Sequence, residues 1–218
     1  MGARKGDFIE VQYVGKLDDG TIFDVSGKEL AEKLHLQGHV HERTVLCLGY
    51  ADILAALDDF LIDKELGKPL TVVISPEQGF GRKDPQLLQM IPMNKFLVQK
   101  INPAPGLRIQ IDQHMGIIKS ISGGRVIVDF NHPLAGRTLT YEITMIKKID
   151  GLCEKVSTIL SQQLHMHDPH LEERNGTVVL LEQIDEAIVP YLEAEIKKRI
   201  PELQALQVKG KKVESSSP

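Results

Sequence analysis

The clearest pattern in the chain is an alternation of apolar and polar residues near position 140. Leu139, Tyr141, Ile143 and Met145 alternate with threonine and glutamate across residues 138–145. A period of two places the two sets on opposite faces, so this stretch predicts a half-buried strand of an antiparallel sheet. Runs rich in β-branched and aromatic residues predict further strands over residues 7–17, 21–24, 43–48, 70–75, 107–111, 116–121, 125–130 and 177–183.

Helical spacing appears first after Asp52. Apolar residues at 53, 57, 60 and 61 recur with the period of one helix face, and Asp52 is expected to cap the start of that helix. Helical composition also predicts helices over residues 27–36, 152–164 and 185–200. Pro190 lies inside the last of these and is expected to interrupt or bend it.

The middle of the chain has a different character. Residues 84–106 contain four prolines around the apolar, methionine-bearing run LLQMIPMNKFLVQKI, and short predicted strands follow it. Beyond Gly151 the pattern becomes more helical, and the final KGKKVESSSP is expected to be disordered. We therefore predict an α+β protein with an antiparallel β domain crossed by one helix, an inserted small β-rich domain and a mixed C-terminal α/β domain.

Composition excludes several classes of function. With 218 residues, 42% of them apolar, the chain fits one large domain or two to three small ones, and its net charge of −4 argues against a nucleic-acid-binding surface. Cys47 and Cys153 are far apart and suit a reducing compartment. No apolar run resembles a secretory signal or a membrane span. We expect a cytoplasmic protein that binds neither nucleic acid nor membrane.

Several motifs carry a resemblance to a known family. The segment VQYVGKLDDGTIFDVS (11–26) resembles the opening of the FKBP-type peptidyl-prolyl cis/trans isomerases, and the similarity continues in order through Leu48-Gly49, Ile53-Leu54, SPEQGFG (75–81) and TLTYEITMI (138–146). The stretch VDFNHPLAG (128–136) resembles the long, SlyD-like branch, in which a chaperone domain called the insert-in-flap interrupts the isomerase domain. Motifs in this order are more specific than any one of them alone.

The resemblance implies a domain organisation. The isomerase domain, an antiparallel FKBP-like half-barrel, would comprise residues 1–82 and 128–150, with the inserted chaperone domain at 83–127. Residues 151–218 resemble the extra C-terminal domain of the longer, archaeal-type members, and we expect them to mediate dimerisation. The implied activity is acceleration of X–Pro isomerisation in unfolded or nascent polypeptides, with no cofactor.

The resemblance also implies a set of pocket residues. Leu57 would form the floor, Ile53 would donate its backbone N–H to the substrate, and the role of the Asp24 carboxylate stays open. Phe80 replaces a tyrosine whose hydroxyl commonly bonds a substrate carbonyl in the family. Singly, each apolar member is more often an ordinary core residue, and only their joint order favours a catalytic pocket. The full set is Tyr13, Phe23, Asp24, Leu46, Ile53, Leu54, Leu57, Phe80 and Tyr141.

The methionine-bearing run of the insertion has two interpretations. Flexible, polarizable methionine side chains suit a surface that accepts varied apolar partners, as a chaperone surface would. The alternative is that the run forms the insertion's own core, which so small a domain needs. The candidate chaperone surface comprises Leu87, Leu88, Met90, Ile91, Met93, Phe96 and Leu97.

Two histidine groups are candidate metal ligands. His35, His39 and His41 form the first, and the sequence HMHDPH (165–170) forms the second. Imidazole is a good ligand for zinc or nickel, but solvated loop histidines are the more common interpretation, and we predict no metal. Two other functions stay open: a holdase chaperone with a catalytically weak pocket, and, third, a metal-responsive folding factor.

Overall fold

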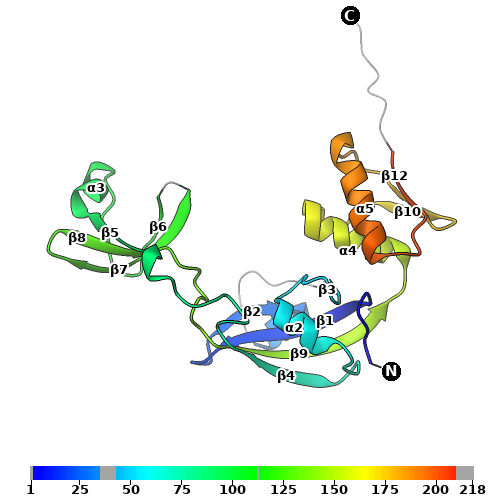
Figure 1. Ribbon diagram of the computed structural model, residues 1–218, viewed down its shortest axis with the longest axis horizontal. Helices are drawn as coiled ribbons and strands as arrows, with labels where there is room; N and C mark the ends of the chain where they lie inside the picture. Colours follow the sequence, from blue (N-terminus) through cyan, green and yellow to red (C-terminus); the bar gives the residue numbers. More distant parts are fainter. Residues whose placement is uncertain (1, 35–42, 112, 210–218) are drawn as a thin grey trace, which may run out of the picture. The chain divides into compact units, whose positions relative to one another are not determined.

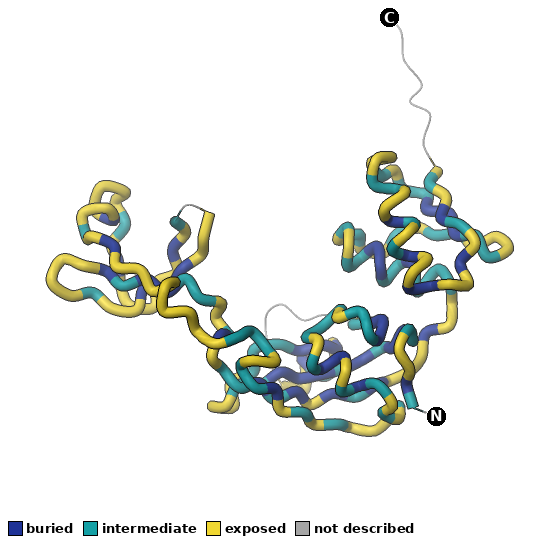
Figure 2. Tube along the Cα trace, viewed as in Figure 1, coloured by how far each residue is buried: buried dark blue, intermediate teal, exposed yellow. Residues whose placement is uncertain are grey.

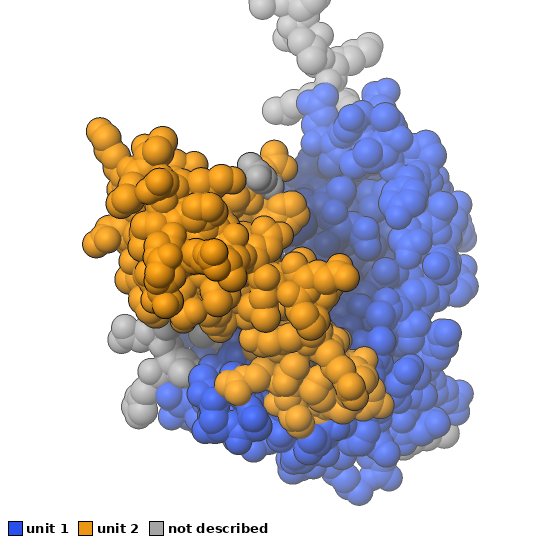
Figure 3. All heavy atoms as spheres, turned by 60° about the vertical axis from the view of Figure 1, so that its left-hand side comes forward, with its two compact units in different colours: residues 1–73, 140–218 blue, residues 74–139 orange. Residues whose placement is uncertain are grey.

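The chain folds as two compact units. The computed structural model describes residues 2–34, 43–111 and 113–209. The first unit comprises residues 1–73 and 140–218, and the second comprises residues 74–139 (Figure 3). Both units mix antiparallel strands with a few helices, so the predicted α+β class is confirmed. The tail that we expect to be disordered lies outside the described residues from position 210 onward.

Strand β1 (Phe8–Leu17) organises the sheet that carries most of the predicted pocket (Figure 1). One edge of β1 is shared by two antiparallel partners, because residues 8–11 pair with β3 and residues 13–16 pair with β2. The other edge pairs with β9, and β4 lies beyond β9. These partners are β2 (Ile22–Ser26), β3 (Thr44–Cys47), β4 (Pro69–Ile74) and β9 (Leu139–Ile149).

The alternation of apolar and polar residues near position 140 forms the predicted half-buried strand, β9. Leu139, Tyr141, Ile143 and Met145 are all buried on β9, whereas the residues between them are more exposed. Buried positions gather along β1 and β9 in Figure 2. Two short helices belong to the same part of the chain, α1 (Lys28–Lys33) and α2 (Ala55–Leu61), and α2 buries Leu57 and Leu61 completely.

The predicted cap of α2 is wrong. The helix begins at Ala55 with Leu54 at the N-cap position, and no side chain caps it. Asp52 instead accepts a hydrogen bond from the backbone N–H of Cys47 and forms an ion pair with Arg199. A carboxylate so close before a helix has the sequence signature of a cap, but these two partners come from elsewhere in the fold and compete successfully for it.

The C-terminal part of the first unit is a small mixed α/β arrangement. Its elements are α4 (Leu152–Leu164), β10 (Leu171–Arg174), β11 (Thr177–Leu180), the 3-10 turn η2 (Glu186–Ile188), α5 (Val189–Arg199) and β12 (Ala205–Val208). The sheet order is β10-β11-β12, with β10 antiparallel and β12 parallel to β11. Pro190 lies in the first turn of α5, where a missing N–H costs little, and not inside a longer helix.

The C-terminal elements share a hydrophobic core with the first sheet. Phe8 on β1, Cys47 on β3 and Ile149 on β9 are buried in the same cluster as residues from α4 and α5, such as Ile159 and Ile196. Apolar contact of this kind is the main stabilising term in folding, so the C-terminal segment does not fold around a separate core of its own.

The second unit contains a four-stranded antiparallel sheet in the order β5-β8-β7-β6. Its elements are η1 (Pro85–Leu87), β5 (Leu88–Pro92), α3 (Met93–Val98), β6 (Arg108–Ile111), β7 (His114–Ser122) and β8 (Arg125–Asp129). The methionine-bearing run thus forms both a strand and a helix. Because β8 pairs with β5 and β7 as far as Asp129, this sheet extends past residue 127, the end that we predict for the insertion.

Among the described residues, no helix is both long and apolar enough to cross a membrane.

Candidate active site

Four of the predicted pocket residues meet on three neighbouring strands. Tyr13 on β1 donates a hydrogen bond from its hydroxyl to Oδ2 of Asp24 on β2, at 3.0 Å. Tyr141 on β9 contacts both aromatic neighbours edge to face, with ring centroids 5.7 Å from Tyr13 and 5.7 Å from Phe23. Such T-shaped contacts are the favoured geometry for aromatic pairs. The strand order β2-β1-β9 therefore assembles an aromatic cluster around one carboxylate.

Gly15 makes room for this cluster. A Cβ atom at Gly15 would lie 2.7 Å from Cζ of Phe23, closer than real Cβ contacts come. The Phe23 ring therefore packs directly on the bare backbone of β1, beside the bulge between Gly15 and Lys16. Tyr13 and Gly15, both on β1, therefore contribute in different ways: Tyr13 supplies a ring of the cluster, and Gly15 leaves space for the Phe23 ring.

The electrostatics of the site keep both tyrosines neutral. Burial raises the pKa of Tyr13 well above its usual value, and the charge and hydrogen bond of Asp24 raise it further. Burial also raises the pKa of Tyr141, again with a contribution from the Asp24 charge. Both phenols therefore stay protonated across the physiological pH range, so that Tyr13 remains a donor to Asp24.

The remaining pocket candidates of the first unit come from β3 and from the approach to α2. Leu46 and Leu57 are buried, whereas Ile53 and Leu54 are half-buried and precede the helix. Half-burial leaves part of each side chain able to contact a ligand. Ile53 lies outside the helix, so its N–H is not committed to the helical hydrogen-bond ladder.

Phe80 belongs to the second unit, where its ring stacks on the imidazole of His132. The ring centroids are 4.2 Å apart and the rings are nearly parallel, at 6°. His132 also organises its turn: Nδ1 accepts a hydrogen bond from the N–H of Leu134, and the carbonyl accepts one from Ala135. The stacking partner of Phe80 has no signal in the sequence.

The candidate chaperone surface divides into exposed and buried members. Ile91 and Phe96 lie in the insert core with Ile118 and Val126, and Met93 packs against that core. These two side chains are mostly buried, and both also line the groove of this unit. The exposed members are Leu87, Leu88, Met90 and Leu97, with exposures of 39%, 44%, 58% and 58%.

One exposed member, Met90, lines a groove. Its volume is about 230 Å³, and its lining comes from β5, α3, β6 and the segment after α3, including Pro92, Ile101 and Ile111. The lining mixes apolar side chains with three glutamines and one lysine, Lys95. A mixed lining of this kind can accept apolar side chains of a partner and bind its backbone through amides.

The structure assembles no metal site from the described residues. No group of three or more histidine, cysteine, aspartate or glutamate side chains comes together in residues 2–34, 43–111 and 113–209. His170, from the second histidine group, pairs its Nδ1 with Glu182 at 2.6 Å. The first group, His35, His39 and His41, lies outside the described residues.

Comparison with known proteins agrees with the motifs. Residues 1–102 match the family described as "FKBP-type peptidyl-prolyl cis-trans isomerase", and residues 89–134 match the domain described as "FKBP26, IF domain". The chain is 31% identical over 142 residues to a short-type peptidyl-prolyl cis-trans isomerase of Methanocaldococcus jannaschii, an alignment that covers 64% of this chain and 90% of that protein.

Two bacterial relatives extend the comparison. A FKBP-type 16 kDa peptidyl-prolyl cis-trans isomerase of Escherichia coli is 30% identical, with 63% of this chain and 87% of that protein aligned. The SlyD isomerase of Haemophilus influenzae is 26% identical, with 78% of this chain and 82% of that protein aligned. The chain therefore belongs to the FKBP-type peptidyl-prolyl cis-trans isomerases.

Proposed function

We propose that this isomerase acts on X–Pro bonds of unfolded polypeptides and that the second unit binds those polypeptides. The observation that carries the catalytic part is the cluster of Tyr13, Phe23 and Tyr141 around Asp24, on neighbouring strands of one sheet. It supplies apolar walls with a single charged group, the environment that amide rotation needs.

Amide rotation requires neither a nucleophile nor a metal. Resonance sets a barrier of about 18–20 kcal/mol, so uncatalysed isomerisation takes tens of seconds or longer. The twisted transition state has lost that resonance and is less dipolar than the planar amide, so a water-poor, apolar pocket favours it. Removing about 6 kcal/mol from the barrier would accelerate rotation about ten-thousandfold.

Asp24 is the polar member of the proposed pocket. Its Oδ2 is occupied by the Tyr13 hydroxyl, which fixes the direction of the carboxylate and leaves Oδ1 for the substrate. A carboxylate held in this way can interact with the twisted amide without reorganising during the reaction. Phe80 brings no hydroxyl, and the loss of one substrate hydrogen bond costs about 1 kcal/mol.

Client binding is the second part of the proposal. Leu87, Leu88, Met90 and Leu97 are exposed, and Met90 also lines a groove that mixes apolar and amide side chains. An unfolded chain exposes apolar side chains that these residues can cover, and covering them removes apolar area from water. Because both sites are in one chain, binding at the groove raises the local concentration of X–Pro bonds to about the millimolar range.

Two further proposals concern the setting of the enzyme. Cys47 and Cys153 are free thiols, and burial, with the charge of Asp52, raises the pKa of Cys47 to about 12. Thiols that stay protonated and unpaired suit the cytoplasm.

We also propose that the C-terminal part pairs with a second copy of the chain, since α5 presents Tyr191 with 69% of its area exposed. Sedimentation of the wild type and of a Tyr191→Ser variant tests this proposed pairing of two copies.

The test of the function is the refolding of a protein whose folding is limited by proline isomerisation, with catalytic amounts of the chain. The wild type should accelerate refolding, and the double variant Asp24→Ala, Tyr141→Ala should not. If the wild type suppresses aggregation without accelerating refolding, the protein is a holdase and the catalytic proposal fails. If nickel or zinc binds tightly and activity depends on it, the metal-responsive alternative replaces the proposal.

A further inference from the structure

The end of helix α5 contacts the loop that leads into α2, and this contact points to a role for the C-terminal part in catalysis. We propose that Arg199 is a positioning residue for the isomerase pocket, holding the loop that carries Ile53 and Leu54. The inference rests on the proposed function, because the loop matters only if these two residues contact the substrate. It assigns to α5 a task distinct from self-association.

The first contact is an ion pair. Nη1 of Arg199 lies 2.7 Å from Oδ1 of Asp52, and the two side chains are only 6% and 5% exposed. The other oxygen of Asp52 accepts the backbone N–H of Cys47 at 2.8 Å. Asp52 thus connects β3 to α5 and immediately precedes Ile53. Because the Asp52 carboxylate is buried, removing Arg199 would leave its charge without this ion-pair partner.

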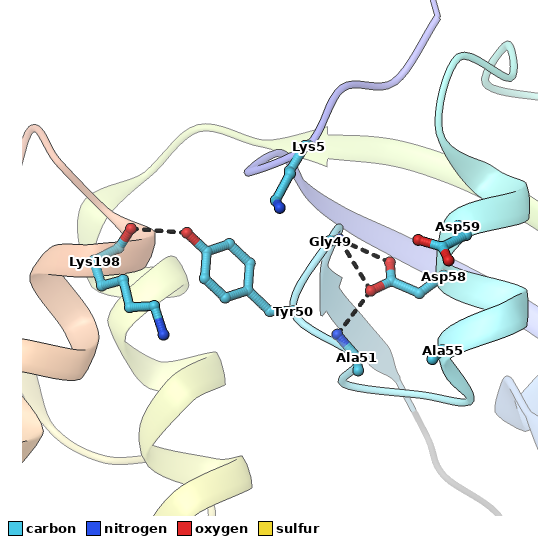
Figure 4. Close-up of a pocket in the computed structure, with 8 residues that line it drawn as sticks. All are labelled: Lys5, Gly49, Tyr50, Ala51, Ala55, Asp58, Asp59 and Lys198. Carbon is cyan, nitrogen blue, oxygen red and sulfur yellow. Dashed lines mark hydrogen bonds between the residues drawn. The ribbon is translucent and has the colours of Figure 1, made fainter.

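The second contact is made by Tyr50. Its hydroxyl donates a hydrogen bond to the carbonyl of Lys198 at 2.8 Å (Figure 4). The guanidinium of Arg199 lies 5.0 Å from the centre of the same ring. This distance is within the range of a cation–π interaction. Both Tyr50 and Asp52 are therefore held by the last turn of the same helix.

The opposite side of the loop is held by α2. The buried carboxylate of Asp58 accepts the N–H of Gly49 at 2.9 Å and the N–H of Ala51 at 2.7 Å (Figure 4). Ala51 has a left-handed backbone with a φ of 56°, which is unfavourable for a residue with a Cβ atom. A strained loop keeps its conformation only while its surroundings hold it.

Packing alone does not hold this loop. A pocket of about 420 Å³ opens beside it, with Lys5, Asp59 and Lys198 among its lining residues (Figure 4). On this side of Gly49–Ala51 only the Lys5 side chain lies against Gly49, so the hydrogen bonds to Asp58 and the contacts with α5 contribute to where Ile53 and Leu54 lie. Loss of the α5 contacts leaves the loop room to move.

The predicted consequence concerns substrate binding more than the chemical step. A mobile loop weakens binding of substrate and transition state alike, so Arg199→Met should raise KM about fivefold and change kcat less than about twofold. Arg199→Lys keeps the charge without the planar fork and should recover about half of the loss. Asp52→Asn should raise KM in the same direction, and the double variant should be no worse than Arg199→Met, because the ion pair is already lost in that single variant.

The experiment measures cis–trans exchange of a short X–Pro peptide by NMR over a range of peptide concentrations. The matched control is Lys197→Met, because Lys197 is in the same turn but pairs with Glu193 on the exposed surface. Its KM should equal that of the wild type within the error of the measurement, because an exposed pair of this kind contributes little. If Arg199→Met does not fold, as judged by circular dichroism, Tyr50→Phe removes only the hydrogen bond to Lys198 and should raise KM about twofold.

The outcomes separate this inference from the proposed function. An inactive wild type would overturn the proposed function itself. An active wild type whose KM is unchanged by Arg199→Met, or, where that variant does not fold, by Tyr50→Phe, would overturn only the positioning role. A fall in kcat with unchanged KM would also overturn it, because loop positioning predicts the reverse.

Discussion

The hydroxyl of Tyr13 donates a hydrogen bond to the carboxylate of Asp24 across strands β1 and β2, at 3.0 Å. The same Tyr13 ring contacts Tyr141 on the next strand, so one residue connects the charged group to the aromatic wall. Because burial keeps the phenol protonated, this donor is permanent under physiological conditions. The orientation of Asp24 is thus determined by a residue eleven positions earlier in the chain.

The first prediction removes that donor. Tyr13→Phe keeps the ring and loses the hydrogen bond to Asp24, so the free energy of unfolding should fall by about 1 kcal/mol. With the carboxylate free to rotate, kcat/KM for a short X–Pro peptide should fall at least about threefold. Tyr191→Phe is the matched control, because Tyr191 is 69% exposed. Equal behaviour of the two variants would show that the hydrogen bond is irrelevant.

The second prediction concerns the space at Gly15. In Gly15→Ala the new methyl group would meet the Phe23 ring at 2.7 Å, so the ring must shift from its present contact with Tyr141. Overpacking of this kind costs about 1–3 kcal/mol in unfolding free energy, and isomerase activity should fall with it. Gly151→Ala provides the control, since its nearest contact would be 3.9 Å. A fully active Gly15→Ala variant would contradict the proposed place of Phe23 in the pocket.

The third prediction separates client binding from catalysis. The double variant Met90→Ser, Leu97→Ser changes two exposed side chains, so the unfolding free energy should change by less than about 0.5 kcal/mol. Binding to an unfolded protein should weaken, whereas activity on a short peptide should not change, because the peptide needs only the pocket. Met115→Ser is the control, an exposed methionine on β7 outside the lining of the groove. Equal losses on protein and peptide would contradict this division of labour.

The fourth prediction is a pH dependence of the second unit. Burial opposes the charge of Asp129, but hydrogen bonds from Lys83 and Asn131 outweigh burial and lower the pKa of this carboxyl to about 2. A lowered pKa stabilises the folded state above the unfolded pKa of about 4, and this stability is lost as the pH falls toward 2. The free energy of unfolding should fall by about 1–2 kcal/mol over this pH range. Denaturation followed through the NMR signals of residues 85–130 measures it. Asp129→Asn should abolish the dependence, and an unchanged profile in that variant would refute it.

The local pattern of the sequence predicts strands well where one face is buried. The alternation around Tyr141 is sufficient to predict β9, and the helix over residues 152–164 matches α4 residue for residue. The methionine-bearing run is harder, because an apolar run without a clear period fits both a strand and a helix. It forms β5 and α3, and the division of its side chains between core and surface depends on the sheet beneath.

The partners of the charged residues could not be predicted from the sequence. Asp52 looks like a helix cap from its neighbours, yet its main partner, Arg199, is 147 positions away. Asp58 has no local signal at all, because an aspartate inside an amphipathic helix usually faces solvent, whereas here it is 2% exposed and holds a loop. The aromatic cluster was predictable through the order of the family motifs, and its hydrogen bond and ring geometry were not.

The most direct test of the pocket is cis–trans exchange of a short X–Pro peptide, observed by NMR with increasing amounts of the chain. A peptide too short to engage the groove reports on the pocket alone. The wild type should raise the exchange rate in proportion to its concentration, and the Asp24→Ala, Tyr141→Ala variant, folded by circular dichroism, should leave it near the uncatalysed rate. A folded double variant as active as the wild type would contradict the assignment of catalysis to the cluster around Asp24.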